Sequence, residues 1–362
     1  MLSADYRALR KDLHALYGVP DTARQAAEFA AHVAMNLGGA ALWFAAESPA
    51  LALGGALLSS LGCLGISTNA HTASHDAIFR SRATNQALVY AGFAFFLMVP
   101  ANYWNHKHLV VHHPVPNVIG LDDDIDLAPV FAFSQDDYDQ AGSWQRLLFR
   151  WQWLIFPFAL ALNGFNAQRQ GAMFLYRKLR SPRRKLRHWL DLGLLLAHVG
   201  VFWALPLAFL PAGELLMFHL LRMALLGYAM FAAFGAAHFP AEAVAVDKRL
   251  AKSDYVLLQT ATTVNFTTGP FGRLLCSGVD FQIEHHLFPE FSHTHYPKMA
   301  PRMRAFCSEH GYPYRTLGWG EAIWKSLTAM AAPRPVLRSV EELRAAATTS
   351  RSESSADGGA HG

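Results

Sequence analysis

Histidine is the residue most able to carry chemistry in this chain, since 18 of its 362 residues are histidine and only 3 are cysteine. The segment Gly278–Pro289 reads G-V-D-F-Q-I-E-H-H-L-F-P. On a helix, Gln282 lies about one turn before His285 and His286, while the two histidines diverge by about 100°. They could therefore serve one metal site or two neighbouring sites, although a histidine without metal is the commoner case.

Other segments supply histidines at similar spacing. One reads N-A-H-T-A-S-H-D, a second reads W-N-H-K-H-L-V-V-H-H-P, and one more histidine ends an apolar stretch. The histidines at matching expected membrane depth are His71, His75, His108, His112, His113, His238, His285 and His286. Eight are too many for one zinc ion and suit two metal ions that share the set. Neutral imidazole suits iron, copper, nickel or zinc.

The apolar residues indicate a membrane protein. They make up 52% of the chain and occur in blocks. The stretches long enough to span a bilayer are about 26–46, 51–68, 189–210 and 215–237. Each pair is joined by only about four residues, which predicts two antiparallel hairpins. Residues 86–101 are apolar but short for a full crossing, so we expect a partly inserted or re-entrant segment there.

Positive charge predicts the topology. The densest cationic run is Arg177–His188, and neither hairpin turn contains Lys or Arg. By the positive-inside rule that run is cytoplasmic. The first 25 residues contain no apolar signal segment. We therefore expect an all-α integral membrane protein with four transmembrane helices in two hairpins. Both termini and a helical cap carrying the histidines should be cytoplasmic, at the inner membrane if the source is bacterial.

The flanking regions divide the chain. Residues 1–25 predict an amphipathic helix that lies on the membrane surface or packs on the protein. Residues 26–330 form the membrane domain, within which Trp151–Phe165 predicts an interfacial helix. The tail, 331–362, should be disordered from about residue 345. A net charge of +4 could indicate nucleic acid, but the basic residues adjoin apolar spans, which excludes that partner and favours membrane lipid.

An acidic run follows the second histidine segment. It contains Asp122 and Asp124. These carboxylates could orient metal-bound imidazoles through the outer ring nitrogen, or they could lie in a solvated loop.

The order of the segments resembles a known family. H-x-x-x-H, H-x-x-x-H-H and Q-x-x-H-H together resemble the membrane fatty acid desaturases, most closely the front-end and related acyl desaturases. Gly120–Ile125, Gln259–Asn265 and His293–Pro297 are also similar to segments of that family. The resemblance covers about residues 30–315. Two departures bear on substrate class: three residues separate His108 from His112, and Asp76 follows the second histidine of its segment.

The resemblance also implies roles. The eight histidines would be ligands of two iron ions, with His238 as the additional ligand after the fourth span. Asn265 would hold a metal-bound water, and Gln282 would occupy a position that other members fill with histidine. The residues expected around the ligands are Asp76, Asn117, Asp122 and Asp124.

The reaction implied is O2-dependent desaturation of a fatty acyl chain linked to a lipid, coenzyme A or a carrier protein. A hydroxylase or ketolase of the same superfamily is an alternative, and a zinc-dependent membrane lipid hydrolase is another from a different class. A metal transporter would instead place its ligands inside the spans near the midplane.

Electrons would come from a separate ferredoxin or small cytochrome, because the chain has no H-P-G-G haem-domain signature. The basic run Arg177–Arg187 could dock an acidic donor or contact anionic lipid headgroups.

Overall fold

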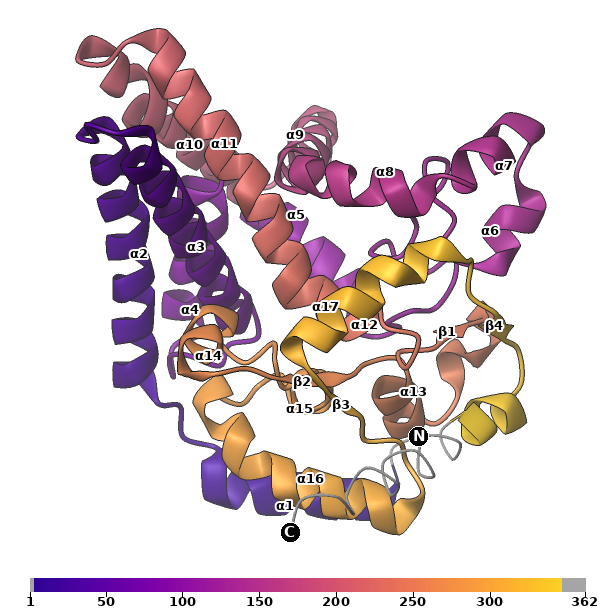
Figure 1. Ribbon diagram of the computed structural model, residues 1–362. Coiled ribbons are helices and arrows are strands. Elements are labelled where there is room, and N and C mark those ends of the chain that lie inside the picture. The colour runs from indigo at the N-terminus through magenta and orange to yellow at the C-terminus, as the bar shows by residue number, and fades with distance from the viewer. Residues whose placement is uncertain (1–2, 347–362) are drawn as a thin grey trace, which may run out of the picture.

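The structure is a computed structural model that describes residues 3–346, and it is mostly helical (Figure 1). The predicted disordered tail lies outside the described residues from 347 onward.

Helices α2 (Thr22–Phe44) and α3 (Pro49–Ser74) run side by side over most of their length (Figure 1). Ser48 begins α3 by accepting a hydrogen bond from the Leu51 N–H. Glycine allows the close approach, because a Cβ at Gly39 would lie 2.3 Å from the backbone nitrogen of Ser59. Small residues of this kind are typical of tightly packed membrane helices.

Among the described residues, three helical segments are long and apolar enough to cross a membrane, each with a mean hydropathy of 1.7. They are Pro49–Ser74, Leu186–Ala208 and Ala212–His238. A fourth arises if Arg82–Phe96 and Ala101–His112, bent by 117°, count as one span. This pair is a broken span or a re-entrant loop, which agrees with the expectation for residues 86–101.

The predicted span at 26–46 coincides with α2, which is not among these candidates. Glu28, His32 and Asn36 lower its hydropathy. The structure therefore supports a membrane protein with three or four spans, and the arrangement of four spans in two hairpins stays a prediction.

Two further regions flank these helices. At the bottom of Figure 1, α1 (Ala4–Tyr17) lies along α16 (Tyr296–His310). Tyr6 and Leu13 are buried in the same core as Met299. Of the two placements open from the sequence, α1 therefore adopts the one packed on the protein. From the centre to the right of Figure 1 lie α9, α8 and α7. Together with the basic stretch that follows α9, they form an arm (residues 143–187) that contains the predicted interfacial segment Trp151–Phe165.

Short elements complete the fold. The strands form two parallel pairs, β1 (Ala245–Val246) with β4 (Val336–Leu337) and β2 (Asn265–Thr267) with β3 (Thr316–Gly318). The other α-helices are α4 (Arg82–Val89), α5 (Ala101–Asn105), α6 (Gln135–Gln140), α7 (Ser143–Phe149), α8 (Gln152–Ala159), α9 (Asn163–Arg180), α10 (Leu186–Val199), α11 (Ala212–Met230), α12 (Ala236–His238), α13 (Tyr255–Ala261), α14 (Pro270–Cys276), α15 (Gln282–Leu287) and α17 (Trp319–Thr328).

Candidate metal centre

All eight predicted histidines come together in the interior. They are supplied by the end of α3, the π-helical turn His106–His112 with the residue after it, the end of α12, and α15. Seven are buried and His75 is half-buried. They form a five-histidine group (His71, His75, His108, His113 and His285) and a three-histidine group (His112, His238 and His286). Within each group the ligand nitrogens all lie within 4.8 Å of one another, so each group could hold a metal ion.

The Nε2 atoms of the five-histidine group converge. Nε2 of His108 lies 3.1 Å from that of His75 and 3.0 Å from that of His113. Nε2 of His113 is also 3.0 Å from that of His285. Neither ring nitrogen of His71 has a hydrogen-bond partner, although the side chain is buried. Such convergence, with unpaired buried nitrogens, fits a metal that would accept their lone pairs.

The π-helical turn decides how the second histidine segment is divided. The N–H of His113 donates to the carbonyl of His108, five residues earlier. His108 therefore lies beside His113, while His112 points into the three-histidine group. The sequence did not predict this division, because the spacing alone does not show that the segment is π-helical.

In α15 the two adjacent histidines separate as a helix requires. His285 belongs to the five-histidine group and His286 to the three-histidine group. Gln282 lies with the latter, since its Nε2 is 2.8 Å from Nε2 of His238 and 3.3 Å from Nε2 of His286. Its Oε1 is buried without a partner. Turning the amide over would present that oxygen to the same point.

The acidic run supports the three-histidine group. Nδ1 of His112 lies 3.0 and 3.1 Å from the two carboxylate oxygens of the buried Asp122. Asp122 also accepts hydrogen bonds from the backbone N–H groups of Asn117 and Asp124. The Asn117 side chain donates to the carbonyl of His238 at 2.9 Å. Three of the four residues expected around the ligands are therefore present there.

Two predicted residues lie apart. Asp76 is exposed and pairs with Arg82 at 3.6 Å, because the chain turns outward after α3. Asn265 uses both ends of its amide on α15: Oδ1 accepts from the Ile283 N–H, and Nδ2 donates to Glu284, each at 2.8 Å. No described contact joins Asn265 to a site histidine, so its role with a metal-bound water stays a prediction.

Sequence reasoning missed Gln259 as a site residue. It is fully buried; its Oε1 lies 2.9 Å from Nδ1 of His286, and its Nε2 donates to the carbonyl of His113. Gln259 thereby orients one ring and holds the backbone of another. The available signal was the similarity of Gln259–Asn265 to the family, which did not say which of its residues contacts histidine.

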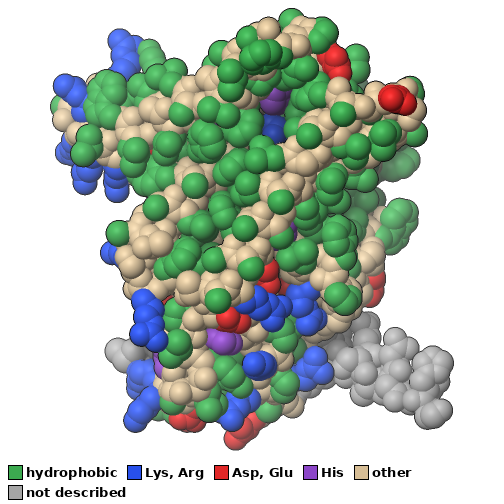
Figure 2. Space-filling model, turned by 90° about the vertical axis from the view of Figure 1, so that its left-hand side faces the viewer, with side chains coloured by type: hydrophobic (Ala, Val, Ile, Leu, Met, Phe, Trp, Pro, Cys, Tyr) green, Lys and Arg blue, Asp and Glu red, His purple; other side chains and the backbone are tan. Residues whose placement is uncertain are grey.

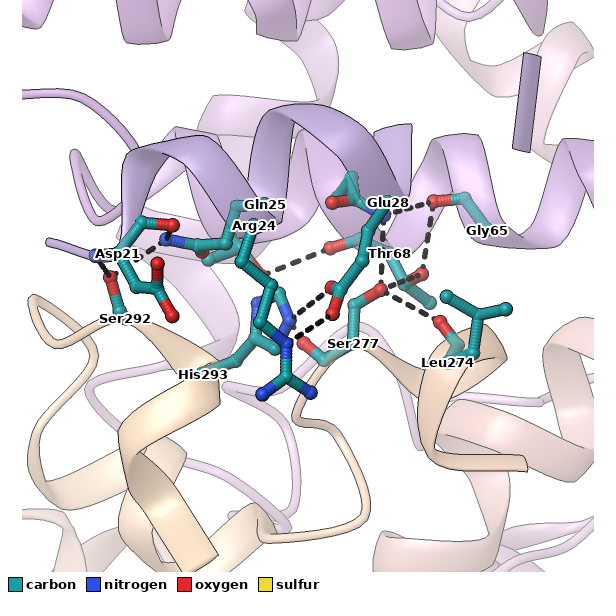
Figure 3. A network of polar contacts seen from close by, with 12 residues as sticks. Asp21, Arg24, Gln25, Glu28, Gly65, Thr68, Leu274, Ser277, Ser292 and His293 are labelled. Carbon is teal, nitrogen blue, oxygen red and sulfur yellow. Dashed lines mark hydrogen bonds and ion pairs between the residues drawn. The ribbon is translucent and has the colours of Figure 1, made fainter. Parts of the chain in front are cut away.

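A buried polar network ties the first and third histidine segments together (Figure 3). Nε2 of His293 lies 2.8 Å from Oε2 of Glu28 on α2. On α3, Thr68 donates to the Ser277 hydroxyl at 3.1 Å, just ahead of α15. The next residue, Gly278, has φ +95°, and a Cβ there would lie 2.3 Å from that of His293. These contacts fix α2 and α3 against the segments on either side of α15.

The environment favours the neutral form of the two histidines of α15. Burial lowers the pKa of His285 and His286 well below the ordinary range, and the neighbouring histidines lower it further. A neutral imidazole offers a lone pair to a metal, so the charge state suits ligation.

The fold and the site together define a class: a helical membrane protein with a buried, histidine-rich centre able to bind metal. The family follows from the sequence match. The fatty acid desaturase family model matches residues 47–318, three quarters of the chain. The chain therefore belongs to the fatty acid desaturase family.

Proteins similar in sequence to this chain are also named as desaturases. The chain is 28% identical over 263 residues to the Delta(5) fatty acid desaturase fat-4 of Caenorhabditis elegans, covering 70% of this chain and 57% of that protein. It is 26% identical to the Delta(8)-fatty-acid desaturase 2 of Arabidopsis thaliana, covering 75% of this chain and 63% of that protein. It is 28% identical to the sn-1 linoleoyl-lipid 6-desaturase of Arthrospira platensis, covering 70% and 72%. The match thus spans less than two thirds of the first two relatives.

Proposed function

We propose that the protein is an O2-dependent di-iron fatty acyl desaturase, which introduces a double bond into a lipid- or thioester-linked acyl chain. The observation that carries this proposal is the pair of adjacent histidine groups, inside a chain of the fatty acid desaturase family. Two groups with eight histidines exceed what a single hydrolytic zinc would use, which disfavours the hydrolase alternative.

The eight histidines are the proposed iron ligands, and Gln282 is an additional candidate in the three-histidine group. Two bound irons would supply the oxidising power that no side chain has. In the overall reaction O2, two external electrons and two protons would be consumed, adjacent methylenes would lose two hydrogens, and two water molecules would form. The chain orients the imidazoles: Asp122 positions His112, and Gln259 positions His286. The apolar helices would hold the acyl chain so that one carbon pair faces the centre.

The proposed membrane topology follows from the apolar spans and the distribution of positive charge. Four spans in two hairpins would leave the termini and the histidine groups on the cytoplasmic side. The names of the relatives support a fatty acyl substrate, and one of them names a lipid-linked acyl chain. Coenzyme A or a carrier protein could also carry the acyl chain, and a separate ferredoxin or small cytochrome would donate electrons.

Product analysis tests the proposal. The chain would be expressed in a bacterial host, with and without O2, and fatty-acid methyl esters would be profiled by gas chromatography and mass spectrometry with double-bond location. We expect a new unsaturated species that needs O2 and is absent with His286→Ala. A hydroxylated species would instead identify the hydroxylase alternative. A new species that forms without O2 would contradict the proposal.

A further inference from the structure

The arm presents an apolar stripe that no part of the described chain covers. The stripe follows helical spacing along α7, α8 and the turn after α8, and its side chains are between 47% and 71% exposed. It consists of Trp144, Leu147, Trp151, Leu154, Phe158 and Leu162. Six large apolar side chains on one face form an exposed patch of the kind that marks an interaction surface.

The opposite face of the same helices is already buried. Phe149, Gln152, Phe156 and Leu160 are all buried. Gln152 makes two hydrogen bonds with the backbone of Ala132, at 2.8 and 3.0 Å. The protein thus covers one apolar face of the arm and leaves the other outside. A helix that is apolar on both faces is typical of a membrane environment.

The sequence from the stripe to the start of α10 carries charge of one sign. Between Asp139 and Asp191 the sequence contains no acidic residue. The basic residues between them are Arg146, Arg150, Arg169, Arg177, Lys178, Arg180, Arg183, Arg184, Lys185 and Arg187. All ten side chains are exposed, and none forms an ion pair with a carboxylate among residues 3–346. Their charge exceeds the +4 of the whole chain, so the remainder is net acidic.

The position of the basic residues indicates which partner they meet. Arg183, Arg184, Lys185 and Arg187 flank Leu186, the first residue of a candidate span. Side chains at the end of a span lie at the depth of lipid headgroups. Figure 2 shows Lys and Arg side chains at the borders of a largely apolar face. Tryptophan beside a span is likewise typical of the membrane interface.

We propose that residues 143–187 form a cationic, aromatic arm that binds anionic phospholipid headgroups selectively, with the apolar stripe inserted among the acyl chains below them. An acidic protein would be attracted by the charge, but it would not account for a tryptophan-containing apolar stripe that the described chain leaves exposed. The proposal does not rest on desaturase activity, and its test involves no turnover.

The first experiment measures how far the positive charge of the arm determines its selectivity for lipids. The full chain would be reconstituted in phosphatidylcholine bilayers containing trace spin-labelled phosphatidylglycerol or phosphatidylcholine. We expect phosphatidylglycerol to be preferred. The preference should fall by about threefold or more in the quadruple variant Arg183→Gln, Arg184→Gln, Lys185→Gln and Arg187→Gln, and also in high salt.

A matched control removes four exposed basic charges elsewhere, with Lys248→Gln, Lys252→Gln, Lys298→Gln and Arg302→Gln. This variant should keep the preference. An unchanged preference in the arm variant, or an equal loss in the control, would overturn the proposal. So would an arm variant that keeps its lipid preference but loses binding to an acidic ferredoxin, which would identify a protein-docking surface.

A second measurement locates the stripe in otherwise native protein. The three cysteines Cys63, Cys276 and Cys307 are buried, so a spin label should react at a cysteine introduced by Leu154→Cys. In phosphatidylglycerol-containing bilayers that label should collide with O2 more than with a water-soluble nickel complex. A label introduced by Lys252→Cys should show the reverse. Water accessibility at position 154 equal to that at position 252 would refute insertion.

Discussion

The two histidine groups each bring their ring nitrogens within 4.8 Å of one another, but the surroundings of the rings differ. The five-histidine group relies on number: its rings pack against one another, with ring centroids as close as 4.3 Å, and both nitrogens of His71 lack a hydrogen-bond partner. In the three-histidine group, Asp122 and Gln259 contact the outer nitrogens of His112 and His286. One group depends on many ligands and the other on well-oriented ligands.

This difference has consequences for metal binding. An outer hydrogen bond fixes both the tautomer and the ring orientation of a ligand, so its loss weakens a small ligand set directly. A group of five histidines should tolerate the loss of one ligand better than a group of three. Four substitutions test this comparison, in order of decreasing expected effect.

His286→Ala should have the largest effect. It leaves two histidines in its group, whereas His285→Ala leaves four in the other. We expect purified His286→Ala to fall from about two metal ions per chain to about one, and His285→Ala to retain more metal but hold it more weakly. Elemental analysis by mass spectrometry measures both. His106→Ala is the control, since His106 is exposed on the same π-helical turn but belongs to neither group. Equal losses in the first two variants would refute the asymmetry.

Asp122→Asn should have the next largest effect. The substitution removes the nearer of the two carboxylate charges at His112 Nδ1, at 3.0 Å against 3.3 Å for Asp124, while nearly preserving shape. We expect about 10–100-fold weaker metal binding in the three-histidine group, measured by competition with a chelator, and little change in the other group. Asp123→Asn changes the neighbouring exposed carboxylate and should leave both affinities as they were. Equal weakening of the two groups would mean that Asp122 acts on the fold as a whole.

Gln282→His should act in the opposite direction. It adds a fourth histidine to the three-histidine group, at a position where the glutamine amide already faces His238. Loss of metal from that group to a chelator should slow by about three- to tenfold, less than the change from Asp122→Asn. Gln282→Leu, which offers no ligand, should speed the loss. If both substitutions speed it, the site has no space for a ligand at position 282.

The sequence predicted which histidines come together better than it predicted how they are divided. Residue type and order were enough to select the eight histidines that the structure brings together, and Asp122 was identified as a partner. The division into two groups depends on the π-helical turn, because a one-residue change in helical pitch moves His108 from His112 to His113. Local spacing does not reveal such a turn.

Long-range contacts were the other limit. Gln259 reaches His286 across 27 residues of sequence, and no helical or strand period links them. The amide of Asn265 contacts Ile283 and Glu284, which are also distant in sequence, and no helical or strand period links these residues. The apolar periodicity of α1 is compatible both with a membrane surface and with packing on α16, so it could not predict the contact with α16 that the structure has.

Glu28→Gln should have the smallest effect and should act through the five-histidine group. The substitution weakens the contact between Glu28 and His293 shown in Figure 3, which helps to hold α2 against the segment after α15. Loss of this partly buried, charge-assisted hydrogen bond should lower the free energy of unfolding by about 1–3 kcal/mol. Helix α3 packs along α2, and the only site histidines at its end are His71 and His75. The metal affinity of the five-histidine group should therefore fall, and that of the three-histidine group should stay the same. Glu47→Gln, at an exposed position in the turn between the two helices, should change neither quantity. Weaker metal binding in the three-histidine group alone would show that the network acts by another route than the position of α3.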